Sequence, residues 1–178
     1  MIDKTKVILV DEKDRETGVS DKMEAHRKAL LHRAISVFIT DGEGRWLMQQ
    51  RHVDKYHSRE LWSNACCSHP APGESTPEAA NRRLMQEMGL TTELSKLFVF
   101  KYMAPMEDDL KEHEVDHVFW DISKELPLPN PEEVQDYRYM HFEEIDQEIK
   151  LNPGIYTEWF KMIYREVQEI IQKRQTNV

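Results

Sequence analysis

The chain has 178 residues, of which 39% are hydrophobic and 32% are charged. This length predicts one domain with a substantial hydrophobic core, and the composition excludes disordered, collagen-like and coiled-coil proteins. The net charge of −9 and the lack of a block rich in lysine and arginine argue against a nucleic-acid partner.

The amino-terminal residues, the hydropathy and the cysteines all favour a cytoplasmic location. Met1 to Lys6 carries charges where a secretory signal needs an apolar stretch, and no run approaches the roughly 18 apolar residues of a membrane span. Cys66 and Cys67 are neighbours, which disfavours a disulfide between them. We therefore expect free thiols, a reducing compartment and no membrane partner.

The amino-terminal third predicts three strands. Val7–Val10 is a short apolar run before a polar stretch at residues 11–18, which indicates an edge strand and a turn. His32–Thr40 is rich in β-branched residues, and Asp-Gly-Glu-Gly follows at residues 41–44 before Trp46–Gln50. This order predicts a strand, a hairpin turn and a second strand.

A long loop and a helix follow. Residues 51–73 show no regular hydrophobic period, which predicts an irregular loop of the kind that is usually functional. Ser75 and Glu78 form the signature of a capping box, and Gly89 has the place of the residue after a helix end. The sequence therefore predicts a helix over residues 77–88.

The remaining chain predicts strands and a closing helix. Residues 96–104 and 114–121 read as strands around an acidic turn at residues 107–109, and residues 137–142 as a last strand. A closing helix of about residues 154–174 is predicted from apolar residues at helical spacing, namely Ile155, Trp159, Met162, Ile163, Val167, Ile170 and Ile171. Residues 1–178 are expected to form a single α/β (α+β) domain, with a mixed sheet packed between helices.

The segment from Ser68 to Leu90 resembles the Nudix box. The matching positions are Glu74, Arg82, Leu84, Glu87, Gly89 and Leu90. Ser68 replaces the opening glycine, and Arg83 and Gln86 replace two glutamates. Ordinary boxes hold a metal ion with several carboxylates on one helix face. Since Arg83 and Gln86 replace two of these glutamates, the cluster of carboxylates is reduced here to Glu87. The resemblance implies a Nudix-like fold and a diphosphate-binding helix, and it argues against the usual hydrolysis.

Two further motifs resemble those of type I isopentenyl-diphosphate Δ-isomerases, a family of the Nudix-like superfamily. Trp-Ser-Asn-Ala-Cys-Cys-Ser-His-Pro at residues 62–70 is similar to W-[ST]-N-x-x-C-x-H-P, and Glu-His-Glu-Val at residues 112–115 is similar to E-x-E-V. With His26 and His32 upstream, the resemblance covers about residues 4–165. It implies an isomerase that interconverts isopentenyl diphosphate and dimethylallyl diphosphate, in isoprenoid biosynthesis, through a carbocation-like state.

The resemblance also implies the catalytic residues. Such an isomerisation needs a proton donor and a proton acceptor on opposite sides of a dry pocket. The family's thiol corresponds to Cys67, with Cys66 pointing elsewhere, and its carboxylate corresponds to Glu114. If their strands are neighbours, Tyr102 can orient Glu114 and relay a proton. The aromatic face of Trp159 would border the cationic carbon.

A divalent ion is implied as well, and its ligands would be His26, His32, His69, Glu112 and Glu114. Glu112 and Glu114 are two residues apart, so on a strand both side chains point to one face. Three nitrogens and two oxygens suit Mn²⁺, Mg²⁺ or a distorted Zn²⁺ site. The other five histidines, including His57, are given no ligand role.

Basic residues are implied to bind the diphosphate of an allylic or homoallylic small molecule, and they correspond to Lys22, Arg51, Lys55 and Arg83. A second ion, Mg²⁺ bound by Glu87, would complete this site. Arg83 and Glu87 are four residues apart, so they share one helix face. The protein is expected to be a monomer or a weak homodimer.

Two alternative functions stay open on the sequence alone. A Nudix hydrolase of a nucleoside diphosphate derivative is favoured by the box and opposed by Arg83 and Gln86. A metal-dependent binding module without chemistry is opposed by the presence of both Cys67 and Glu114. Release of phosphate or of a nucleoside monophosphate would separate the hydrolase from the isomerase.

Overall fold

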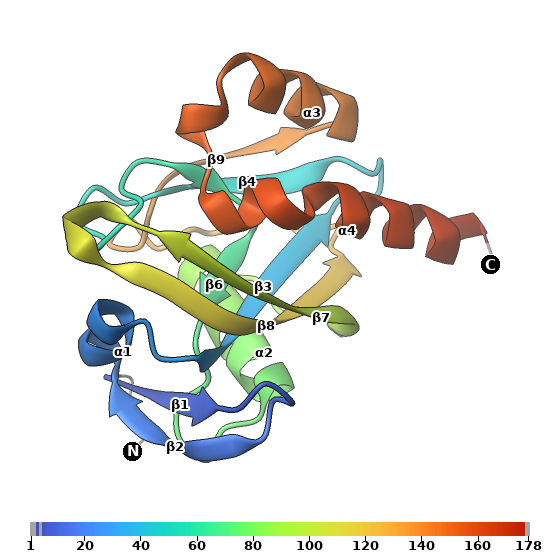
Figure 1. Ribbon diagram of the computed structural model, residues 1–178. Helices are drawn as coiled ribbons and strands as arrows, with labels where there is room; N and C mark the ends of the chain where they lie inside the picture. The colour runs from blue at the N-terminus through green and yellow to red at the C-terminus, as the bar shows by residue number, and fades with distance from the viewer. Residues whose placement is uncertain (1–2, 4, 177–178) are drawn as a thin grey trace.

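The computed structural model of the protein describes residue 3 and residues 5–176. Its centre is a mixed sheet of nine strands with helices on both faces, as expected from the sequence (Figure 1). No helix in the described part of the chain is long and apolar enough to cross a bilayer.

Strand β3, His32–Thr40, is the centre of the sheet. It pairs in parallel along its whole length with β8, Lys111–Ile122, and its other edge pairs antiparallel with β6, Cys66–Ser68. Only Thr40 pairs with β4, Trp46–Arg51. Both predicted strands and the turn between them are therefore confirmed, but the strands do not pair along their length, because β6 occupies the edge of β3 that β4 would need.

The amino-terminal hairpin lies at one end of the sheet (Figure 1). Strand β1, Lys6–Val10, pairs with β2, Glu16–Asp21, and Leu9 pairs with the first residue of β3. The edge strand is thus β2, not β1 as predicted, and the predicted turn ends where Glu16 begins to pair. The side chain of Asp21 accepts backbone hydrogen bonds at the start of α1, Lys22–Lys28, a short helix that the sequence pattern did not predict.

Residues 51–73 are less irregular than predicted. They contain β5, Trp62–Ser63, which pairs with β4, and they also contain β6. Strands of two or three residues are too short to show an alternating pattern, so sequence periodicity could not reveal them.

A long hairpin of β7 and β8 confirms the two strands predicted there. Strand β7 covers Ser95–Pro105, and a 3-10 turn at Glu107–Asp109 leads into β8. The last strand, β9, covers Val134–Met140 and pairs with β4. The prediction that this strand extends to Phe142 is wrong, because Phe142 begins α3, Phe142–Leu151. The sequence analysis did not predict this helix.

Helix α2, Thr76–Met88, confirms the predicted helix with both of its ends. The backbone N–H of Ser75 donates to the Glu78 carboxylate (2.9 Å), and the Ser75 hydroxyl accepts from the Glu78 backbone. Gly89 follows with a φ of 66°, and a Cβ there would lie 2.7 Å from the carbonyl oxygen of Leu128. Both the left-handed backbone and this close approach require glycine.

The closing helix α4 covers Glu158–Thr176, and residues Pro153–Ile155 form a separate 3-10 turn. The predicted start near residue 154 is therefore too early. Ile155 and Met162 are exposed rather than part of the apolar stripe. Ile155 precedes the helix, and Met162 lies on the flank of the buried stripe, whose members are Trp159, Phe160, Ile163, Tyr164, Val167 and Ile171.

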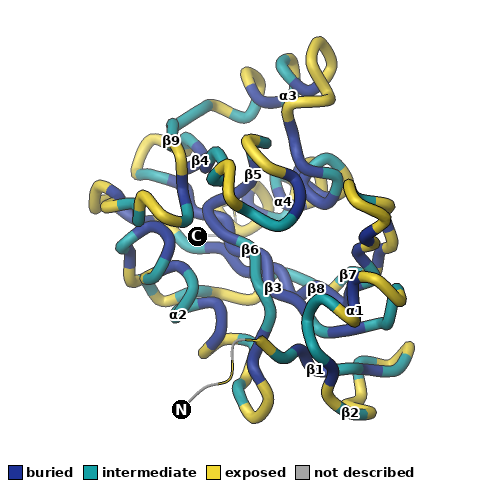
Figure 2. Tube along the Cα trace, turned by 90° about the vertical axis from the view of Figure 1, so that its left-hand side faces the viewer, coloured by how far each residue is buried: buried dark blue, intermediate teal, exposed yellow. Residues whose placement is uncertain are grey.

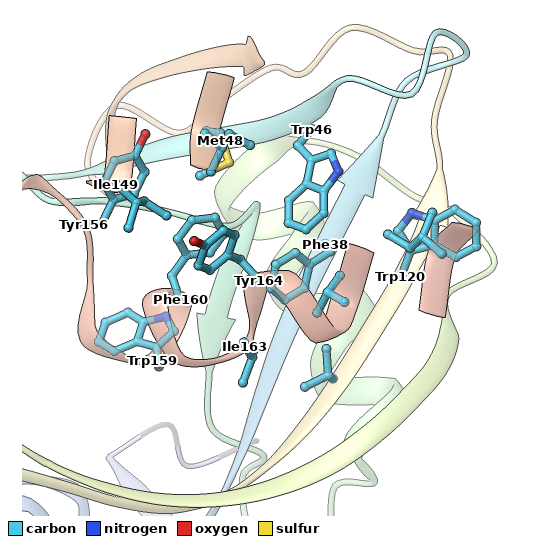
Figure 3. Packing of buried hydrophobic residues seen from close by; sticks show 14 of the residues in the cluster. Phe38, Trp46, Met48, Trp120, Ile149, Tyr156, Trp159, Phe160, Ile163 and Tyr164 are labelled. Atoms are coloured by element: carbon cyan, nitrogen blue, oxygen red, sulfur yellow. The ribbon is translucent and has the colours of Figure 1, made fainter. Parts of the chain in front are cut away.

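Two hydrophobic clusters cover the two faces of the sheet. On one face α3 and α4 pack against aromatic residues that include Phe38 and Trp46 (Figure 3). On the other face α2 packs through Leu84 and Met88 onto the alternate residues of β3. The dark, buried part of the trace runs through these central strands (Figure 2). His32, at the start of β3, belongs to neither cluster and faces the polar site described next.

Candidate active site

The residues that the motifs single out converge on one cavity of roughly 410 Å³. Helices α1, α2 and α4, strands β6, β7 and β8 and the loop after β4 all contribute to its wall. The candidate residues that line it are Lys22, Arg51, Lys55, Cys67, His69, Arg83, Tyr102, Glu112, Glu114 and Trp159. Three further candidates, His26, His32 and Glu87, are almost fully buried and touch these lining residues.

Five of the side chains form a compact group of possible metal ligands: His26, His32, His69, Glu112 and Glu114. One ligand atom from each lies within 4.8 Å of all the others. The Glu114 Oε1 atom is 2.7 Å from His69 Nε2 and 3.3 Å from His32 Nε2. Strand β8 supplies both carboxylates on one face, as their spacing of two predicted.

The backbone orients two of the imidazoles. The Nδ1 atom of His26 is 3.2 Å from the carbonyl oxygen of Lys111, and Nδ1 of His32 is 2.8 Å from that of Leu30. A carbonyl can only accept, so each Nδ1 carries a proton and each Nε2 is the nitrogen that a metal ion would bind. In the metal-free site the Nε2 of His26 lies 3.2 Å from the Tyr56 hydroxyl.

The donor set fits a divalent cation. The buried Oε2 of Glu112 makes no hydrogen bond, and the pKa of His69 is lowered well below its usual value by burial and by the charge of Lys22. Neutral imidazoles and ionised carboxylates are the forms in which these groups bind a metal ion. The structure therefore shows a His/Glu group that could hold one.

The two adjacent cysteines point to opposite faces of the sheet. Cys66 is fully buried in the cluster under α2, whereas Cys67 lines the cavity. Both are free thiols, as predicted. The Sγ of Cys67 donates to Asn64 Oδ1 (3.1 Å) and lies 3.5 Å from the Ser36 hydroxyl. Burial and the charge of Asp116 raise the pKa of Cys67 to about 12, so this thiol holds its proton at neutral pH.

Glu114 lies beside Tyr102, as the neighbouring strands predicted. The two residues are register partners in the β7–β8 hairpin, and the Tyr102 hydroxyl donates to Glu114 Oε2 (2.8 Å). Burial alone would raise the pKa of Glu114, but a hydrogen bond from the His32 imidazole and the positive charge of that ring outweigh it and lower the pKa to about 2. The carboxylate is therefore ionised in the metal-free site.

Four basic side chains line the cavity: Lys22, Arg51, Lys55 and Arg83. The Lys22 ammonium lies 4.2 Å above the Tyr56 ring, and burial together with Arg83 lowers its pKa to about 8. The Arg51 guanidinium lies 5.3 Å from the ring centre of Trp159, whose indole N–H donates to Ser63. The positive charges of these four side chains suit an anionic ligand.

Arg83 and Glu87 share a face of α2, as predicted, and form an ion pair. The second carboxylate oxygen of Glu87 accepts from the Gln49 amide (2.9 Å). Gln86 accepts from Arg82 (3.2 Å) and from Arg83 (3.4 Å). Two positions that carry glutamates in the ordinary box thus hold an amide and a cation. Glu87 is the remaining carboxylate of the box on this helix, and it lies beside the basic side chain of Arg83.

Two residues that the sequence analysis passed over also belong to the site. The Nε2 of His57 lies 2.7 Å from Glu112 Oε1, and its ring packs edge-on against Trp159. Asp116 accepts a hydrogen bond from Ser36 (2.6 Å) within the same cavity. Asp116 continues the alternating acidic positions of β8, a signal that the sequence contains. His57 lies in a loop and offers no such signal.

The mixed sheet, the capped helix with its charged face and the adjacent metal-ligand group define the class as a Nudix-type domain. A family profile described as the NUDIX domain matches residues 30–160. The fold is similar to that of DR0079 from Deinococcus radiodurans, with a TM-score of 0.76 and 16% identity over 90% of this chain and 98% of that one. A MutT NUDIX hydrolase from Burkholderia pseudomallei has a TM-score of 0.59 and 16% identity over 74% of this chain and 94% of that one.

Sequence relatives narrow the class further. The isopentenyl-diphosphate Delta-isomerase of Pectobacterium atrosepticum is 46% identical over 94% of this chain and 94% of its own length. The isopentenyl-diphosphate Delta-isomerase 1 of Aromatoleum aromaticum is 47% identical over 87% of this chain and 88% of its own. The chain therefore belongs to the isopentenyl-diphosphate Δ-isomerase family of Nudix-domain proteins.

Proposed function

We propose that the protein interconverts isopentenyl diphosphate and dimethylallyl diphosphate. The observation that carries this function is the placement of Cys67 and Glu114 in one cavity. Their strands, β6 and β8, pair with opposite edges of β3. A proton-holding thiol and an ionised carboxylate thus flank one space, as a reaction that adds one proton and removes another requires.

The diphosphate would bind to the basic side chains. Lys22, Arg51, Lys55 and Arg83 offer charged donors to its oxygens, and Arg83 can bind two oxygens at once. We assign a Mg²⁺ ion that accompanies the diphosphate to Glu87, which already lies against Arg83. The hydrocarbon end of the substrate would then extend toward Cys67 and Glu114.

The proton transfers would use the thiol and the carboxylate as a pair. In each direction of the reaction one of them protonates the alkene and the other accepts the proton that leaves. Tyr102 holds the Glu114 carboxylate through its hydroxyl and can relay the proton that resets the pair. The ring of Trp159, which lines the same cavity, would border the cationic carbon.

The cavity favours this chemistry because its reactive groups are shielded from water. Tyr102, Glu114 and Trp159 are each less than one-tenth exposed. A carbocation-like state formed here would meet fixed protein groups rather than solvent. We assign a divalent ion, Mn²⁺, Mg²⁺ or Zn²⁺, to the His/Glu group, where it would supply positive charge that polarises the site beside Glu114.

Hydrolysis of a nucleoside diphosphate derivative is the less favoured function. The helix face that carries several metal-binding carboxylates in an ordinary Nudix box here carries Arg83 and Gln86. The relatives with 46% and 47% identity bear the isomerase name. We also expect the protein to be cytoplasmic and to be a monomer or a weak homodimer, which sedimentation analysis can measure.

The function can be tested by proton NMR with isopentenyl diphosphate and Mg²⁺ in deuterated buffer. We expect the methyl signals of dimethylallyl diphosphate to appear and deuterium to enter the product. A folded, metal-loaded protein that leaves this substrate unchanged but hydrolyses nucleoside diphosphate derivatives would overturn the proposal in favour of the hydrolase.

A further inference from the structure

The basic side chains of the cavity already face an anion that belongs to the protein, Glu133. The ammonium of Lys55 donates to Glu133 Oε2, and Arg83 Nη2 lies 3.5 Å from the same oxygen. The side chains of Lys55, Arg83 and Glu133 are all largely shielded from solvent. One carboxylate oxygen thus lies between two of the four cations that we assign to the diphosphate.

The backbone holds Glu133 in this place. The N–H of Asn130 donates to the carbonyl of Glu87 on α2 (2.9 Å), and the N–H of Glu133 donates to the carbonyl of Asn130 (3.0 Å). The N–H of His52 donates to the carbonyl of Glu133 (3.2 Å), at the start of the loop that carries Lys55. The turn at residues 130–133 is therefore tied to both segments that present the cations.

The Glu133 carboxylate is ionised in this position. Burial alone would raise its pKa, but the contacts with Lys55 and Arg83 lower it. Arg83 also pairs with Glu87, so its guanidinium already contacts two carboxylates before any ligand enters. A phosphate group that bound to Lys55 and Arg83 would compete with the Glu133 carboxylate for their N–H donors and their charge.

We propose that Glu133 is an internal counter-ion that competes with anionic ligands for Lys55 and Arg83 and thereby lowers the affinity of the pocket for every anion. The competition weakens every anion by the same factor. A single phosphate group has few other contacts to offset that factor, whereas a diphosphate also reaches Lys22 and Arg51. Lys22 and Arg51 therefore give the pocket its preference for diphosphates, and Glu133 keeps the more weakly bound orthophosphate and monophosphates from occupying it. From the proposed function this inference takes only that a diphosphate occupies the pocket.

The test is calorimetric binding of inorganic pyrophosphate and of orthophosphate to the chelator-treated protein, without catalysis. Glu133→Gln removes the charge and keeps the shape and the backbone contacts of the turn. We expect both anions to bind about tenfold more tightly to this variant, which corresponds to roughly 1.4 kcal/mol. Unchanged or weaker binding would overturn the proposal, since Glu133 would then organise the cations rather than compete for them.

Glu132→Gln is the matched control, because Glu132 lines the same cavity beside Glu133, is exposed, and forms no ion pair among the described residues. We expect it to change either affinity by less than about twofold. An equal gain in both variants would reduce the effect to net charge and overturn the specific role of Glu133. Thermal melts of both variants verify that they are folded.

A double-mutant cycle with Lys55→Met tests the route of the effect. If Glu133 competes at Lys55, the tightening caused by Glu133→Gln should shrink to a few-fold when Lys55 is already absent. A tightening that stays at about tenfold in that background would contradict competition at this side chain. Because pyrophosphate is not isomerised, these results are independent of whether the isomerase activity is found.

Discussion

Replacing Lys22 with methionine should stabilise the metal-free protein at neutral pH while it weakens diphosphate binding. Burial and Arg83 lower the pKa of Lys22 from 10.5 to about 8. At about 1.4 kcal/mol per pKa unit, keeping this lysine charged costs the folded state on the order of 3 kcal/mol. The substitution also removes the contact between the ammonium and the Tyr56 ring, which destabilises the folded state by about 1 kcal/mol. The net increase in the free energy of unfolding is therefore about 2 kcal/mol.

The pH dependence identifies the cause. Below pH 8 both the folded and the unfolded lysine hold their proton, so the folded state bears the full cost. Between pH 8 and pH 10.5 the folded state releases the proton first, and the cost is lost. Urea unfolding with chelator present should therefore show the gain for Lys22→Met at pH 7 and less than about 1 kcal/mol at pH 10.

The control for this prediction is Lys28→Met in the same helix. Lys28 is exposed and pairs with Glu24 at the helix surface, so its loss should change the free energy of unfolding by no more than about 0.5 kcal/mol at either pH. The argument that Lys22 carries a desolvated charge would be refuted by either of two results. One is a gain in the free energy of unfolding, relative to the wild type, that is the same at both pH values; the other is a Lys22→Met variant that is less stable than the wild type at pH 7.

Four further predictions concern the site. Cys67→Ala and Glu114→Gln should each fold, and their turnover, measured by NMR, should fall about 10² to 10⁴-fold. Near-normal turnover in either variant would contradict the assignment of these residues as the proton-transfer pair. Cys66→Ala should keep its turnover and lose about 1 kcal/mol of unfolding free energy in urea; an inactive but stable variant would mean that the wrong thiol was assigned. His57→Ala should weaken Mn²⁺ binding about 10 to 100-fold by calorimetry, because it removes the side chain beside Glu112, and unchanged affinity would rule that role out. Turnover should stop in a strong chelator and return with Mn²⁺ or Mg²⁺, whereas activity that persists without metal would contradict the proposed ligand group.

The elements that the sequence predicted well carry strong local signals. The helix α2 was predicted with both ends because Ser75, Glu78 and Gly89 satisfy its end groups locally. Strand β3 and the hairpin of β7 and β8 are long enough for their composition to be informative. The short strands β5 and β6 exist because neighbouring segments pair with them, which no local pattern records. Helix α1 has a local cap at Asp21, but its seven residues are too few to show a helical period.

The candidate site shows the same division. Cys67, His69 and the two carboxylates could be found because they lie in short motifs with fixed spacing. His26 and His32 lie outside these motifs and were assigned from the resemblance to the family, by their order along the chain. His57 and Glu133 could not be found in this way, since their roles depend on a loop and a turn that fold against Glu112 and Lys55. Contacts between segments far apart in sequence, rather than the residue types themselves, give these two side chains their place.

The alternation of β6 gives the protein two chemical reporters on a single peptide. An alkylating reagent can reach Cys67 through the cavity, slowly because its thiol is protonated, but it can reach Cys66 only when the sheet separates from α2. Tandem mass spectrometry can assign a label to either neighbour. Protection of the first thiol then measures occupancy of the cavity, and labelling of the second measures opening of the core, in the same sample and at the same time.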